Sequence, residues 1–107
     1  MKMILAVIDK DDSSGVISNL SKEGFRVTTL STTGGFLRAG NVTILVGVED
    51  EKTQDVISII KEHSRSRSRQ MPALTGNEAS FIAPMAVEVS VGGATIFVMN
   101  VEQFEKV

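Results

Sequence analysis

Short apolar runs and segments with helical periodicity alternate along the N-terminal half of the chain. The continuous apolar run at residues 3–8 predicts a central strand that is covered on both faces. Residues 25–31 and 42–48 are two further strand-like runs, and a glycine-rich stretch at residues 32–41 separates them. The pattern therefore predicts three strands in this half of the chain.

Two segments between these runs have the signals of helices. The first helix is predicted from the acidic and serine-rich residues 9–14, which can cap its N-terminus, to about Lys22, with Gly24 as its C-terminal cap. The second follows the carboxylates at residues 49–51 and ends near residues 63–64. Its buried stripe is expected to contain Thr53, Val56, Ile57 and Ile60, at positions i, i+3, i+4 and i+7.

The C-terminal part combines one long irregular segment with two strand-like runs. Residues 64–84 predict a long loop, which in a small domain is usually functional. Residues 86–91 alternate, Gly92–Gly93 predicts a two-residue hairpin turn, and residues 94–101 form a long apolar strand. Because both faces of that last strand are apolar, we expect another subunit to cover it. Residues 102–107 are expected to form one helical turn.

The order strand, helix, strand, strand, helix and final strand predicts an α+β fold of the ferredoxin-like (split βαβ) type. We expect an antiparallel sheet, an extra C-terminal strand and a long loop after the second helix. A length of 107 residues suits one domain spanning residues 1–107.

Composition excludes several classes of function. The chain has no cysteine, so disulfides, thiolate chemistry and cysteine metal sites are excluded. A net charge of −2 argues against binding to nucleic acid polymers. No apolar run is long enough for membrane insertion, and the N-terminus lacks the pattern of a signal peptide, so we expect a cytoplasmic protein.

Catalytic and metal-binding motifs are not recognisable in the sequence. It contains no nucleophile elbow, no phosphate-binding P-loop and no dinucleotide fingerprint. Asp9, Asp11 and Asp12 lack the spacing of a calcium loop and are better explained as helix-capping residues. His63 is the only histidine and lies at a predicted helix end. We therefore predict no catalytic residue, no metal ligand and no enzymatic activity.

The glycine-rich stretch at residues 32–41 is unusual for a turn. Phe36 and Leu37 offer apolar surface, while Arg38 and Asn41 offer hydrogen bonds, and the surrounding glycines permit close backbone approach. These residues suit a loop that closes over a flat, partly apolar anion. They equally suit a hairpin loop whose apolar pair packs into its own core or against a subunit. Arg38 can reach a phosphate or pair with a carboxylate.

The strands beside this loop favour a ligand-binding groove. Arg26 and Thr28 share one strand face. If Ser31 pairs near Val42, Arg26 lies opposite Gly47, and a glycine within an apolar strand often marks the close approach of another group. The arginine would then contact a phosphate, while the glycine leaves room for a flat base. The alternative is an exposed edge face with a β-bulge.

The alternating Arg65, Arg67 and Arg69 allow two interpretations. They can contact a phosphate or an acidic partner. They can also be a solvated segment whose cations suit the negative end of the preceding helix, which we favour.

Four segments resemble the PII-like cyclic-di-AMP receptor family. They are residues 25–28, the loop at 32–41, Gly47–Val48 and residues 87–99. The loop and the Val-Gly-Gly-Ala-Thr sequence are specific in combination. The resemblance covers nearly the whole chain except the arginine–serine segment and the loop that follows it.

This resemblance implies a homotrimer of ferredoxin-like protomers that binds cyclic-di-AMP in the clefts between subunits. It implies a sensor without catalysis or a further cofactor, whose loops rearrange and signal to an unidentified partner protein. Alternatives are an adaptor trimer without a ligand and a sensor of another nucleotide such as ATP. In the ATP-sensing PII proteins the long loop lies between the second and third strands, whereas here it follows the second helix. The ligand-binding residues implied by the resemblance are Arg26, Thr28, Gly35, Phe36, Leu37, Asn41, Gly47 and Phe97.

Overall fold

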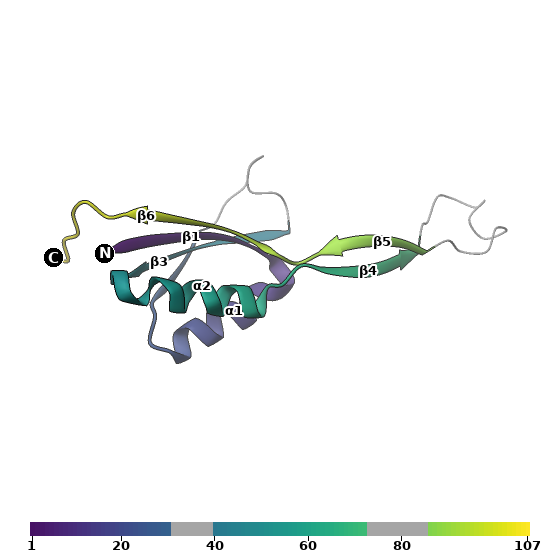
Figure 1. The fold of residues 1–107 in the computed structure, drawn as a ribbon, viewed down its shortest axis with the longest axis horizontal. Coiled ribbons are helices and arrows are strands. Elements are labelled where there is room, and N and C mark those ends of the chain that lie inside the picture. Colours follow the sequence, from purple (N-terminus) through teal and green to yellow (C-terminus); the bar gives the residue numbers. More distant parts are fainter. Residues whose placement is uncertain (31–39, 73–85) are drawn as a thin grey trace.

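The computed structural model describes residues 1–30, 40–72 and 86–107, with side chains at 1–30, 40–68 and 92–107. Four strands form an antiparallel sheet in the order β2-β3-β1-β6, and two more strands form a separate pair, β4-β5 (Figure 1). The strands of the larger sheet are β1 (Lys2–Asp9), β2 (Val27–Leu30), β3 (Asn41–Val48) and β6 (Ala94–Asn100). This strand order confirms the predicted ferredoxin-like α+β fold.

Helix α1 (Lys10–Lys22) begins within the predicted N-terminal segment at residues 9–14 and ends at Lys22, close to its predicted end. The Asp9 carboxylate accepts a hydrogen bond of 2.9 Å from the Asp11 amide and so caps the N-terminus. At the other end the amides of Gly24 and Phe25 donate to the carbonyls of Ser21 and Leu20, each at 3.0 Å. Gly24 has φ +87°, so this is the glycine-dependent Schellman ending.

Helix α2 (Thr53–His63), preceded by the short helix η1 (Asp50–Lys52), lies on the same face of the sheet as α1 (Figure 1). Alternate residues of β1 and β3 point toward the helices and are buried. The buried apolar residues are Ile4, Ala6, Ile8, Val16, Leu20, Ile44, Val46, Val48, Val56 and Ile60. Thr53, Val56 and Ile60 of the stripe predicted for the second helix are buried, so that prediction is confirmed at these three positions.

The opposite face of the sheet, which we call the outer face, has no helix on it in the described part of the chain (Figure 1). Met3, Leu5 and Val7 of β1 point to this face and are only half-buried. At the sheet edge, Phe97 and Met99 of β6 are 42% and 43% exposed. The prediction that β1 is covered on both faces therefore holds, within the described residues, only for the face toward the helices.

Three predictions for the C-terminal part are wrong. Strand β4 (Arg67–Pro72) pairs with β5 (Ala86–Val91), so part of the predicted irregular segment is regular structure. Gly92–Gly93 is not a hairpin turn, because β5 pairs with β4 while β6 pairs with β1. Both glycines have positive φ, +78° and +83°, and they link the two sheets. Residues 102–107 form no helix.

Candidate functional site

A groove of about 590 Å³ lies on the outer face, at the end of the sheet where β1 and β6 meet the chain termini. Strands β1, β2 and β3, helix η1 and the C-terminal segment all contribute to its walls. Its lining residues are Met1, Met3, Gly24, Phe25, Arg26, Thr28, Leu45, Gly47, Val48, Glu49, Lys52, Val101 and Phe104.

Strand register brings the predicted residues of the groove together. Val27 pairs with Val46, and Thr28 pairs with Leu45. Extending this antiparallel register by one residue places Arg26 opposite Gly47, as the sequence predicted. All of Arg26, Thr28 and Gly47 line the groove, so the prediction of a shared surface is confirmed.

Gly47 keeps the floor of the groove open. It lies opposite Met3 in the β1–β3 pair, and it is exposed although it is flanked by the buried residues Val46 and Val48. A Cβ added at Gly47 would meet only the end of the Met1 side chain, at 3.4 Å. A side chain here would therefore project into the groove without disturbing the backbone.

The groove carries free positive charge. Arg26 and Lys52 are exposed, and neither side chain has an ion-pair or hydrogen-bond partner in the described part of the chain. The Met1 amino group, in contrast, lies 2.8 Å from the Asp50 carboxylate, and this contact lowers the pKa of Asp50. Glu49 adds one carboxylate to the wall. Among the described residues, no carboxylate forms an ion pair with either cation, so an anion that enters the groove can bind both.

Two other predicted site residues lie away from the groove in the same chain. Asn41 is exposed at the start of β3, about 20 Å from Gly47 at the rise of an extended strand. Phe97 lies on the opposite sheet edge from Thr28, three strand spacings or about 14 Å away. The predicted residues Gly35, Phe36 and Leu37 lie outside the described residues.

Sequence reasoning missed several wall residues. Met3 and Leu45 could have been found, because strand alternation places them on the same face as Gly47. Lys52 and Phe104 carry no local signal, since chain folding alone brings them there. The C-terminal segment is held beside the N-terminus by a 3.1 Å hydrogen bond from the Val101 amide to the Met1 carbonyl.

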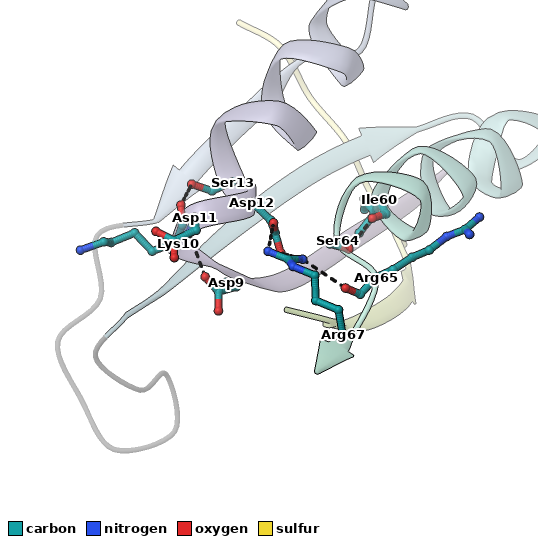
Figure 2. Close-up of polar contacts among 9 residues, drawn as sticks. All are labelled: Asp9, Lys10, Asp11, Asp12, Ser13, Ile60, Ser64, Arg65 and Arg67. Atoms are coloured by element: carbon teal, nitrogen blue, oxygen red, sulfur yellow. Dashed lines mark hydrogen bonds and ion pairs between the residues drawn. The ribbon is translucent and has the colours of Figure 1, made fainter. Parts of the chain in front are cut away.

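The arginine–serine segment has a structural role that the favoured interpretation missed. Arg67 belongs to β4 and donates to both carboxylate oxygens of Asp12, at 3.0 and 3.2 Å (Figure 2). This contact raises the pKa of Arg67. Asp12 is accordingly an ion-pair partner and Asp9 the helix cap, so the acidic cluster divides between two roles. The side chain of Arg69 lies outside the described residues.

Metal and membrane sites have no support among the residues that the structure describes. No group of three or more histidine, aspartate or glutamate side chains is placed to hold a metal ion within that part of the chain. None of the described helices is long and apolar enough to cross a bilayer.

Comparison with known proteins gives a family match and a structural match, each over all or nearly all of the chain. Residues 1–107 match the sequence profile of a family described as cyclic-di-AMP receptor. The fold is similar to the crystal structure of a functionally unknown protein from Pediococcus pentosaceus ATCC 25745, with a TM-score of 0.76 and 36% sequence identity. That similarity covers 99% of this chain and 96% of the other.

Proposed function

This chain belongs to the cyclic-di-AMP receptor family, and from that premise we propose that the groove containing Arg26, Thr28 and Gly47 binds cyclic-di-AMP. The observation that carries the proposal is the pairing of two free cations with apolar walls in one groove. Its volume of about 590 Å³ lies within the range typical of small-molecule sites.

The chemistry of the groove matches a cyclic dinucleotide. Such a ligand carries two phosphates and two flat bases, so it requires cations and apolar surface together. Arg26 and Lys52 each supply one cation to the groove, and charge-assisted hydrogen bonds to phosphate are stronger than neutral ones. Met3, Leu45 and Phe104 supply the apolar surface for a base. The open floor at Gly47 lets a base approach the backbone.

A second subunit would complete the site. Phe97 and Asn41, which the family resemblance assigns to the ligand, lie about 14 and 20 Å from parts of the groove in their own chain. The exposed Phe97, Val98 and Met99 of β6 give the protomer an apolar edge that favours self-association. We place Phe97 of one protomer against the groove of its neighbour in a homotrimer.

The proposed receptor is cytoplasmic and transmits ligand binding to a partner protein rather than performing catalysis. Cyclic-di-AMP would stabilise one arrangement of the segments around the groove, because a ligand shifts a protein toward the conformation that it binds best. The rearranged segments, including the loop at residues 32–41 named from the sequence, would present the surface that the partner binds.

Thermal melting with three nucleotides tests this function. Cyclic-di-AMP should raise the melting temperature in a concentration-dependent way, because it binds only the folded state, whereas cyclic-di-GMP and ATP should have much smaller effects. Light scattering should give the mass of three chains. A trimer with no response to any nucleotide would support the adaptor alternative, and a stronger response to ATP would support a PII-like ATP sensor.

A further inference from the structure

The first turn of α1 is bonded to two segments that are far apart in the sequence. Lys10 is the first residue of the helix, and its amide is one of the donors that have no partner within a helix. Gly40, where the chain enters β3, accepts from this amide at 2.8 Å. The next residue, Asn41, is paired with Asp9 in the β1–β3 ladder. The entry to β3 is thereby fixed to the start of α1.

The other side of the same helical turn holds the β4–β5 hairpin. The Asp12 carboxylate accepts two hydrogen bonds from Arg67, the first residue of β4 (Figure 2). The Asp12 side chain is only 11% exposed, against 50% for Arg67. Arg67 Nη1 also donates to the Arg65 carbonyl at 3.2 Å. A two-point contact of this kind fixes orientation as well as distance, unlike a single surface ion pair.

The residue directly after β5, where the chain leaves the hairpin, packs against the same ion pair. Gly92 follows β5 directly, and a Cβ at this residue would lie 2.6 Å from Arg67 Nη1 and 2.7 Å from the Arg65 carbonyl. Its φ of +78° is also unfavourable for other residues. Both ends of the hairpin therefore meet at the Asp12 carboxylate, and the hairpin projects from this point away from the larger sheet (Figure 1).

We propose that the first turn of α1 is a joint that couples the entry of β3 to the orientation of the β4–β5 hairpin. The inference rests on the proposed function, because a ligand in a neighbouring subunit's groove that contacts Asn41 would have a route through this joint to the hairpin. A displacement of Gly40 and Asn41 moves Lys10, and Lys10 moves the carboxylate of Asp12 within the same turn. Asp12 and Arg67 are positioning residues, since neither lines the groove.

Arg67→Gln is the deciding variant, because it removes the ion pair and leaves α1 unchanged. If the joint exists, loss of Arg67 loosens the Lys10–Gly40 hydrogen bond, and exchange of the Lys10 amide should accelerate by roughly fivefold. Arg65→Gln is the matched control, because it removes a neighbouring arginine side chain that makes no ion pair in the described residues. Hydrogen exchange, followed by NMR on the ligand-free proteins, measures the exchange rate of the Lys10 amide in both variants. Equal Lys10 exchange in the wild type and Arg67→Gln would overturn the joint.

A ligand-dependent measurement completes the test. Cyclic-di-AMP should change hydrogen exchange along β4 and β5 in the wild type and in Arg65→Gln, and this response should fall by roughly fivefold in Arg67→Gln. The exchanged pair Asp12→Arg with Arg67→Asp should restore most of it. A full response in Arg67→Gln would overturn the proposal while leaving cyclic-di-AMP binding intact. If the wild type bound no cyclic-di-AMP, the proposed function would fail, and the ligand-free exchange of Lys10 would still decide whether the joint exists.

Discussion

Thr28 and Phe97 lie on one cross-strand row of the outer face, at opposite edges of the sheet. The row runs from Thr28 through Leu45 and Leu5 to Phe97. Three strand spacings separate its ends by about 14 Å. A ligand group that contacts Thr28 is therefore far from Phe97 of the same chain, and this separation favours the proposal that the phenylalanine comes from a second protomer.

This geometry predicts that two variants with weak ligand binding restore binding sites when they are mixed in one trimer. Arg26→Ala removes a groove cation and Phe97→Ala removes the aromatic residue of the neighbour, so each alone should bind cyclic-di-AMP weakly. Random mixed trimers should place an intact groove beside an intact Phe97 at about a quarter of the interfaces. Calorimetry on co-refolded protein should recover that fraction of sites with wild-type affinity.

The control is a mixture of each variant with itself, treated in the same way. No recovery in stably mixed trimers would contradict a site shared between subunits, and it would place Phe97 outside the ligand site.

Lys52 is predicted to be a second contact for the anionic ligand. Lys52→Gln should weaken cyclic-di-AMP binding by roughly fivefold, a modest loss because the side chain is exposed and screened by solvent. It should also make the affinity less sensitive to salt. Lys22→Gln is the control, since Lys22 is an exposed lysine at the end of α1 and does not line the groove. Equal affinities for the two variants across a salt series would remove Lys52 from the site.

Gly47→Ala should separate stability from binding. Glycine within a strand costs about 0.5–1 kcal/mol relative to alanine, and the added methyl group meets only the movable end of Met1. We expect an unchanged or higher melting temperature together with weaker cyclic-di-AMP binding, and still weaker binding for Gly47→Leu.

Gly15→Ala provides the matched control for this substitution. Gly15 lies in α1 with nothing within 4 Å of its added Cβ, so alanine should raise stability and leave binding unchanged. If Gly47→Leu bound as tightly as the wild type, the ligand would not approach the floor of the groove.

Asp50 predicts a specific pH dependence of stability. The Met1 amino group lowers the pKa of this carboxyl below its ordinary value of 3.8, so the ionised form is favoured in the folded state. The resulting stabilisation is present above pH 3.8 and is lost as the pH falls through the lower folded-state pKa. Asp50→Asn should therefore flatten the decline of the melting temperature in acid relative to the wild type. Parallel declines for the variant and the wild type would contradict the Met1–Asp50 contact.

The sequence determined the features that depend on neighbouring residues. Asp9 and Gly24 mark the two ends of α1, and both could be predicted because capping interactions act within one helical turn. The position of Arg26 opposite Gly47 could be predicted because strand alternation and the pairing register together determine which residues share a face. These local rules were enough to predict the fold and three residues of the groove.

Longer-range features left no such signal. Arg67–Pro72 lacks a clear apolar alternation, and its partner strand β5 begins only at Ala86. The Asp12–Arg67 pair joins residues 55 positions apart. Lys52 and Phe104 reach the groove only through the packing of η1 and the path of the chain after β6. Periodicity cannot encode contacts that the tertiary fold alone creates.

Calorimetric titration of cyclic-di-AMP into the wild type and Arg26→Ala tests the central claim most directly. The account predicts saturable binding by the wild type. It also predicts a loss of about 1.5–3 kcal/mol in Arg26→Ala, or roughly 10- to 150-fold in Kd, because a charged hydrogen bond to phosphate disappears. No heat from the wild type at saturating ligand, or equal affinity in the two proteins, would contradict it.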